Sequence, residues 1–275
     1  MYNDLFSIGP VTIHGYGLMI GLGVMAALLL AYFRAPRKNL SQDAVLDLVI
    51  CALIFGFIGS KLLYVLVSLP QFLAAPLSVL GSEGFVIYGG ILGGLCAMLV
   101  YCRRKKLLFL DYFDLLVPSV ALAQGFGRVG CFLAGCCYGR ETSGALGVIF
   151  PAGSMAPAGV RLLPTQLISS AGDLLFAAIL LLYARKSKRR GDVGALYLLL
   201  YGVGRFLVEF LRNDYRGELF GLSTSQFISI FIVLGGGALL LWNRKRKEPH
   251  ASGEADRPEE TPEAKAAEDA DLPVE

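Results

Sequence analysis

Four ionisable side chains lie within stretches of the sequence that are otherwise apolar: Lys61, Arg128, Arg205 and Glu209. A charged side chain in a bilayer costs about 2.5–3.5 kcal/mol on insertion scales, so a charge within an apolar span is a candidate functional residue. An arginine keeps its charge and can hold phosphate oxygens through two parallel N–H bonds. Two arginines at the depth of the lipid headgroups would therefore form a site for a phosphate, and the commonest phosphate at that depth belongs to a phospholipid.

The stretches that carry these charges have the length and composition of membrane spans. Of the 275 residues, 55% are hydrophobic and 17% are charged, whereas a soluble domain is about a quarter charged. A run of roughly 18 or more apolar residues can cross a hydrocarbon core of about 30 Å. The expected spans are Tyr16–Phe33, Ala44–Val67, Phe85–Tyr101, Phe113–Ala134, Thr165–Tyr183, Val193–Leu211 and Ser225–Trp242. The sequence therefore predicts an all-α integral membrane protein with about seven transmembrane helices.

Short clusters of Lys and Arg set the orientation of these spans. They follow the first, third, fifth and seventh spans, at residues 34–38, 103–106, 185–190 and 244–247, and the loop after the second span has neither Lys nor Arg. Positively charged loops stay in the cytoplasm, so we expect the amino terminus outside and the carboxyl terminus inside. Because the basic residues do not form one patch with interleaved aromatic residues, nucleic acid is not an expected partner.

The predicted orientation places the four charges at one depth. Each lies in the outer half of a span that runs outward, and the first and third spans begin outside near Tyr16 and Tyr88. We expect these side chains to line one polar cavity that takes a lipid sideways from the outer leaflet. Structural explanations stay open, because Arg205 and Glu209 can pair four residues apart on one helix and Lys61 can extend its ammonium group to the headgroups.

Arg128 is flanked by glycines that allow another backbone or a ligand to approach closely. This segment resembles the signature of the prolipoprotein diacylglyceryl transferases, which reads Gly-Arg-x-Gly followed by a Phe and further glycines. The matching positions are Gly127, Arg128, Gly130, Phe132, Gly135 and Gly139.

The resemblance continues in order along the chain, from about Ile13 to Trp242. The other matching segments are Ile13–Met19, Gly59–Lys61 with Lys in place of Arg, Asp114 with Pro118, Pro164–Leu167, Tyr201–Arg212 and Leu222–Ser229. Each piece is short, but the ordered set is specific, and seven spans with this orientation also agree with the family.

The resemblance implies an enzyme that moves the diacylglyceryl group of phosphatidylglycerol onto the lipobox cysteine thiol of secreted preproteins. This reaction is the first step of bacterial lipoprotein maturation. The resemblance also implies a multi-pass protein of the bacterial cytoplasmic membrane whose site faces the outer leaflet. Arg128 and Arg205 would hold the phosphate and stabilise its growing charge. Glu209 would position Arg205 or a substrate hydroxyl, and Tyr16 and Tyr201 would line the cavity. The residues expected to bind the lipid are Lys61, Tyr88, Gly89, Gly90, Gly127, Arg128, Gly130, Tyr201 and Arg205.

The sequence departs from the family pattern at three positions. The family commonly has His-Gly-Gly where this chain has Tyr88, Gly89 and Gly90, and it has Asn and Glu where this chain has Cys131 and Cys136. These changes favour, as an alternative, a paralogous transferase with a different acceptor. A lipid-binding or transport protein without catalysis is a second alternative, although we find neither paired repeats nor charges spread through the full membrane depth.

Three cysteines, Cys131, Cys136 and Cys137, lie at the outer end of the fourth span. They can be reduced, packed thiols, or they can include a disulfide such as Cys131–Cys136. Their spacing is unlike that of known zinc pairs and no fourth ligand is evident, so we expect neither a metal nor a cofactor.

The domain organisation follows from composition. We expect one polytopic membrane domain over residues 1–247. Residues 248–275 are rich in Glu, Asp, Ala and Pro, and they predict a disordered acidic tail in the cytoplasm.

Overall fold

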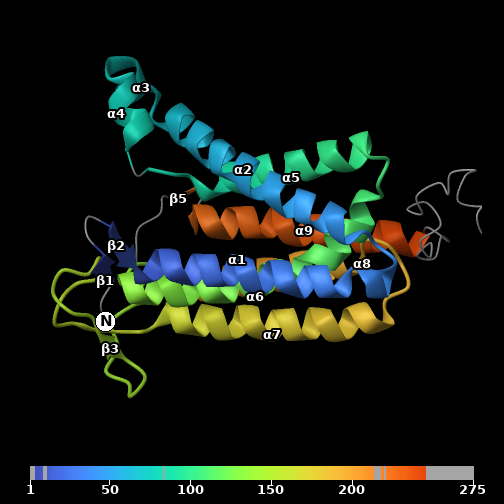
Figure 1. Ribbon diagram of the computed structural model, residues 1–275. Helices are drawn as coiled ribbons and strands as arrows, with labels where there is room; N and C mark the ends of the chain where they lie inside the picture. Colours follow the sequence, from blue (N-terminus) through green and yellow to red (C-terminus); the bar gives the residue numbers. More distant parts are fainter. Residues whose placement is uncertain (1–3, 9–10, 83, 214–217, 220, 246–275) are drawn as a thin grey trace, which may run out of the picture. The chain divides into compact units, whose positions relative to one another are not determined.

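The computed structural model describes residues 4–8, 11–82, 84–213, 218–219 and 221–245 (Figure 1). The chain divides into two compact units, which are described separately. Of the described residues, the first unit comprises those up to residue 33 and from residue 110 onward, and the second comprises those of Arg34–Phe109. The predicted acidic tail, residues 248–275, lies outside the described residues.

The first unit is built from five long helices and short β-hairpins within the described residues. The helices are α1 (Gly15–Arg34), α6 (Phe109–Ala134), α7 (Thr165–Lys186), α8 (Asp192–Glu209) and α9 (Thr224–Lys245). The hairpins pair β1 (Asp4–Ile8) with β2 (Val11–His14), β3 (Val148–Ile149) with β4 (Arg161–Leu162), and β5 (Glu218–Leu219) with β6 (Leu222–Ser223). The first hairpin precedes α1 and the other two lie in connections between helices, where pairing satisfies backbone groups that no helix satisfies. The sequence did not predict them.

Helix α6 is the centre of the first unit and runs alongside both α1 and α7 (Figure 1). Its buried residues Val117 and Ala121 pack with Ala177 and Leu180 of α7 and with Val193 of α8. The backbones approach closely where side chains are small. The Ser170 hydroxyl of α7, for example, donates a hydrogen bond of 2.9 Å to the Gly125 carbonyl of α6. The residue that α6 presents near its end, Arg128, is therefore held on the best-packed helix of the unit.

A buried carboxylate fixes the start of α8 against α6. Asp114 accepts hydrogen bonds of 2.7 Å from the backbone N–H groups of both Gly191 and Gly194. These N–H groups lie at the helix amino terminus, where no partner within the helix exists and where a negative charge is favourable. The nearby pair of Arg190 with Asp111, at 3.2 Å, adds a second tie between the two segments. Helix α8 therefore has a defined position along α6, which sets where Arg205 stands.

The second unit is a helical pair with a short helical arm. It contains η1 (Pro36–Lys38), α2 (Gln42–Val67), α3 (Leu69–Ala74), α4 (Pro76–Gly81) and α5 (Ile87–Arg104). Helices α2 and α5 meet at glycines: a Cβ on Gly89 would clash with the Gly59 carbonyl, and a Cβ on Gly93 would clash with the Phe55 carbonyl. Small residues allow this close approach, as they do between membrane helices in general.

Each expected span corresponds to one long helix among the described residues, with ends that differ by a few positions. Five of these helices, α1, α2, α6, α7 and α9, are long and apolar enough to cross a membrane. The remaining two, α5 and α8, have 18 residues each, and α8 carries Asp192, Arg205 and Glu209. The protein is therefore a mostly helical membrane protein.

Candidate functional site

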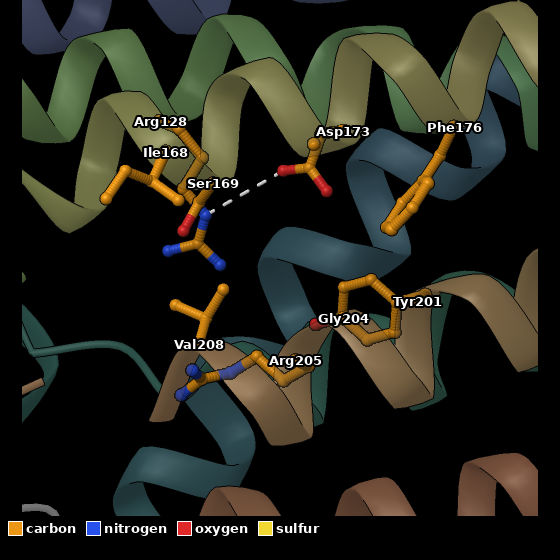
Figure 2. A pocket seen from close by; sticks show the side chains of 10 residues that line it. Arg128, Ile168, Ser169, Asp173, Phe176, Tyr201, Gly204, Arg205 and Val208 are labelled. Atoms are coloured by element: carbon orange, nitrogen blue, oxygen red, sulfur yellow. Dashed lines mark ion pairs between the residues drawn. The ribbon is translucent and has the colours of Figure 1, made fainter. Parts of the chain in front are cut away.

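A cavity opens between α6, α7 and α8 of the first unit (Figure 2). It encloses about 380 Å³ of space, its open mouth included. Arg128 enters it from α6, Asp173 from α7 and Arg205 from α8. The other lining residues are Ile168, Ser169, Gly172, Phe176, Tyr201, Gly204 and Val208. Two guanidinium groups from different helices thus face one small, largely apolar space.

Arg128 is paired with a carboxylate on the neighbouring helix. Its Nε lies 4.0 Å from Oδ2 of Asp173, and the Arg128 side chain is 24% exposed. The ion pair orients the guanidinium across the cavity, as Figure 2 shows. Within the part of the chain that the structure describes, this pair uses one nitrogen of a guanidinium that carries five donors, so the other N–H groups of Arg128 can bind a ligand.

Arg205 is held from two sides. Its NH1 atom lies 2.7 Å from Oε2 of Glu209, and its NH2 atom donates a hydrogen bond of 2.6 Å to the Ser225 hydroxyl of α9. Both Arg205 and Glu209 are at most 10% exposed. The same Glu209 oxygen lies 3.9 Å from Nε of Arg212. Arg205 therefore both pairs with Glu209 on its own helix and lines the cavity. The ion pair holds its guanidinium in place there.

The ion pairs beside the cavity contain more arginines than carboxylates among the described residues. Arg128, Arg205 and Arg212 carry three positive charges, and Asp173 and Glu209 carry two negative charges. These charges lie in surroundings where they are poorly screened. An anion that enters the cavity is therefore attracted by the cluster as a whole.

Aromatic rings and a glycine shape the surroundings of the two arginines. The Tyr201 ring stacks on Tyr197, with centroids 5.8 Å apart and planes at 23°, and the Tyr197 hydroxyl donates a hydrogen bond of 3.1 Å to the Gln124 amide oxygen. A Cβ on Gly130 would lie 3.2 Å from the Tyr16 ring, whereas a Cβ on Gly127 would meet nothing within 4 Å. A Cβ on Gly130 would thus press on α1, while Gly127 borders open space.

Sequence comparison places the chain in a known family. Residues 3–242 match the family model described as "Prolipoprotein diacylglyceryl transferase". The chain belongs to this family. It is 47% identical over 246 residues to the phosphatidylglycerol–prolipoprotein diacylglyceryl transferase of Clostridium tetani, covering 89% of this chain and 98% of that protein. It is 46% identical to the phosphatidylglycerol–prolipoprotein diacylglyceryl transferase 2 of Clostridium perfringens, over 91% of this chain and 98% of that protein. It is 33% identical to the phosphatidylglycerol–prolipoprotein diacylglyceryl transferase of Staphylococcus carnosus, over 89% of this chain and 91% of that protein.

The family resemblance also included residues of the second unit. There the Lys61 ammonium donates hydrogen bonds to the Ser82 carbonyl at 2.6 Å and to the Gly84 carbonyl at 3.4 Å, and it lies 4.8 Å from the centre of the Phe85 ring. Lys61 therefore joins α2 to the segment that precedes α5. Tyr88, Gly89 and Gly90 form the first turn of α5, and Cβ atoms on either glycine would clash with α2. Contact of these residues with lipid stays a prediction.

Sequence reasoning missed the ionisable residue that faces Arg128 in the cavity, as well as the uncharged residues other than Tyr201 that line it. Asp173 lies in the fifth expected span and faces Arg128. The rule that singled out Arg128, an ionisable group inside an apolar stretch, applies equally to Asp173. The signal was therefore present in the sequence.

The three clustered cysteines lie beside this site. All six cysteines are free thiols. The sulfur atoms of Cys131, Cys136 and Cys137 all lie within 4.8 Å of one another. Hydrogen bonds from the Cys131 and Cys136 side chains, together with the Arg212 guanidinium, lower the pKa of Cys137.

Proposed function

We propose that this protein transfers the diacylglyceryl group of phosphatidylglycerol to the lipobox cysteine thiol of prolipoproteins, the first step of bacterial lipoprotein maturation. Two relatives that are matched over 98% of their length carry the name of that activity. The observation that carries the proposal is the convergence of Arg128 and Arg205 on one cavity. A cavity with two guanidinium groups and apolar walls suits a phosphate joined to a glycerol and two acyl chains.

The reaction requires a sulfur–carbon bond to form while a carbon–oxygen bond breaks. The acceptor thiol loses its proton, and the thiolate attacks the glyceryl carbon next to the phosphate. The electron pair of the broken bond leaves with the phosphate oxygen, so glycerol phosphate departs as an anion and the product is a thioether. Negative charge on the phosphate grows as this bond breaks. Arg128 and Arg205 stabilise that charge more strongly in the transition state than in the bound lipid, which lowers the barrier.

Each further site residue has a role in this scheme. Glu209 is a positioning residue, because its carboxylate holds Arg205 at 2.7 Å. Asp173 does the same for Arg128 at 4.0 Å. Tyr201 lines the cavity, and Tyr16 packs against the helix that carries Arg128. The remaining residues proposed to contact the lipid are Lys61, Tyr88, Gly89, Gly90, Gly127 and Gly130.

We further propose a membrane arrangement with seven spans, the amino terminus outside and the carboxyl terminus in the cytoplasm. Helices α5 and α8 then cross along with the five more apolar helices. Their 18 residues reach about 27 Å at a rise of about 1.5 Å per residue, close to the hydrocarbon thickness. The charged residues of α8 are tolerated because they face partners inside the protein. In this arrangement the cavity opens toward the outer leaflet of the cytoplasmic membrane, where phosphatidylglycerol and secreted preproteins meet.

Two rival functions make different predictions. A paralogue with another acceptor is favoured by Tyr88, Cys131 and Cys136, which replace the residues common in the family. A lipid carrier would bind phosphatidylglycerol without breaking a bond.

One assay separates these functions. The purified protein is incubated in phosphatidylglycerol liposomes with a lipobox peptide, and the thioether and the released glycerol phosphate are measured by mass spectrometry. We expect equal amounts of both products, and their loss in Arg128→Ala. Release of glycerol phosphate only with some other acceptor would favour the paralogue. Lipid movement between leaflets with no release would favour the carrier, and either result would refute the proposed activity.

A further inference from the structure

The three clustered cysteines come from two short segments that the backbone folds toward each other. Cys131 lies on the last turn of α6, and Cys136 and Cys137 lie in the loop that follows. The chain reverses through left-handed backbone conformations at Gly135, with φ of 71°, and at Cys137, with φ of 61°. A non-glycine residue at such a φ costs of order 1–3 kcal/mol and persists only where its surroundings hold it there.

The neighbouring helix supplies what holds this turn. At the start of α7, the Gln166 amide donates a hydrogen bond of 2.7 Å to the Cys136 carbonyl, and the Thr165 hydroxyl donates one of 2.9 Å to the Cys137 carbonyl. Gln166 and Thr165 are each 1% exposed. Two buried side chains thus fix the two carbonyls and, with them, the directions of both cysteine side chains toward Cys131.

The positions of the sulfur atoms suit a thiophilic cation. Zinc binds thiolates at about 2.3 Å, which places the sulfurs of a tetrahedral site about 3.8 Å apart. The three sulfurs here lie within 4.8 Å of one another, so a shift of about 1 Å or less completes the site. The cysteines are only partly buried, which leaves a path for an ion.

Two arginines lie close to parts of the cysteine cluster. Arg212 acts electrostatically on Cys137, and Arg128 lies three residues before Cys131 on the same helix. Positive groups stabilise thiolates, which are the metal-binding form of cysteine. A single disulfide would use two of the three sulfurs and leave the third without a role.

We propose that Cys131, Cys136 and Cys137 hold a divalent cation of the zinc class, with a fourth coordination position left open. Three protein ligands with one open position is the arrangement of catalytic rather than structural zinc. The spacing along the sequence differs from known zinc pairs because the tight turn at Gly135, rather than a zinc-finger loop, brings the ligands together.

The open position has a candidate occupant, and this step rests on the proposed function. The acceptor of that reaction is a cysteine thiol, which must lose its proton before it attacks. A thiol bound to such a cation is deprotonated outright. The acceptor sulfur takes the fourth position as a thiolate, its proton passes to water, and the sulfur then forms the bond to the glyceryl carbon while glycerol phosphate leaves.

The first experiment measures the ion alone. The full chain is purified in nanodiscs under a phosphine reductant, and its zinc content is measured by elemental mass spectrometry. We expect about one equivalent per chain, lost in Cys131→Ser, Cys136→Ser and Cys137→Ser but retained in the matched control Cys96→Ser. Equal zinc content in the cluster variants and the wild type would overturn the proposal, as would an intact Cys131–Cys136 disulfide in protein taken from membranes without reductant.

A second measurement uses only the wild-type protein, so misfolding of a cysteine variant cannot affect its result. Alkylation of each cysteine in the wild-type protein is followed by peptide mass spectrometry, with and without added Zn²⁺. Zn²⁺ is expected to slow the alkylation of all three cluster cysteines about tenfold or more while leaving Cys96 unchanged. The same rates with and without Zn²⁺ would contradict a metal site.

The acceptor step is tested with cobalt in place of zinc. Binding of a lipobox peptide to the Co²⁺ protein should change the sulfur-to-cobalt absorption band, and the same peptide with serine in place of cysteine should not. Full transfer activity in metal-free protein would sink the metal inference while leaving the proposed function intact. Co²⁺ binding without thioether formation on any lipobox peptide would sink the proposed function while leaving the metal site intact.

Discussion

Replacement of Arg205 by lysine isolates geometry from charge at the phosphate site. In the native protein, two different nitrogens of Arg205 bind two partners on two helices, at 2.7 Å to Glu209 and at 2.6 Å to Ser225. Lysine has one nitrogen on a flexible stem, so it cannot keep both contacts and also hold a phosphate oxygen. The variant therefore retains its positive charge but loses at least one charge-assisted hydrogen bond in the transition state.

The size of the effect follows from that lost bond. A hydrogen bond to a charged group is worth about 1.5–3 kcal/mol, and each 1.4 kcal/mol is a factor of about ten. We expect kcat/KM for phosphatidylglycerol to fall about 10- to 150-fold in Arg205→Lys. If the bond strengthens as the phosphate gains charge, most of the loss falls on kcat rather than on KM.

The assay is initial-rate lipidation of a lipobox peptide in liposomes of varied phosphatidylglycerol content. The matched control is Arg185→Lys, because Arg185 lies exposed in the last turn of α7. That control should stay within about twofold of wild type, as surface substitutions do. An Arg205→Lys protein that is folded and equally active would refute the phosphate clamp, since charge alone would then be sufficient.

Three further predictions test the supports of the site. Asp173→Asn should lower kcat/KM about tenfold, because Arg128 loses the charge that orients it, and lipidation kinetics measure this. Asp114→Ala removes the acceptor of two buried N–H groups and should lower the free energy of unfolding by about 1–3 kcal/mol, measured by thermal or denaturant unfolding in detergent. Gly130→Ala should lower the melting temperature because its Cβ would press on α1, whereas Gly127→Ala should leave it unchanged. Equal melting temperatures for the two glycine variants would contradict the packing described for α6.

The long helices were predictable because each is a continuous apolar run. Their observed bounds differ from the expected spans by a few residues, and α2, for example, begins at Gln42 rather than at Ala44. Helix ends depend on caps rather than on hydropathy: here the Ser41 hydroxyl accepts a hydrogen bond from the Ala44 N–H. Hydropathy has no information about such a contact, so it places a helix well and its ends poorly.

The short hairpins and the helical arm of α3 and α4 were not predicted. The arm follows α2 without a charged residue and contains two prolines, Pro70 and Pro76, each near the start of its short helix. Helices of six residues are too short to show an apolar period. Their existence depends on local contacts, such as the hydrogen bond from Lys61 to the Ser82 carbonyl.

The sequence by itself determined the class of the protein, its family and the arginines of its cavity, because burial of a charge in an apolar span is costly wherever that span packs. Only the tertiary structure decided which groups meet. It set Asp173 opposite Arg128, joined Arg205 to Ser225 on another helix, and gathered three cysteine sulfurs that the spacing alone had argued against as ligands. The physical reason is that hydropathy along a chain reports how costly a residue is in the membrane, whereas lateral neighbours depend on the rotation and close approach of separate helices. Those are set by glycines, caps and buried hydrogen bonds between segments far apart in the sequence.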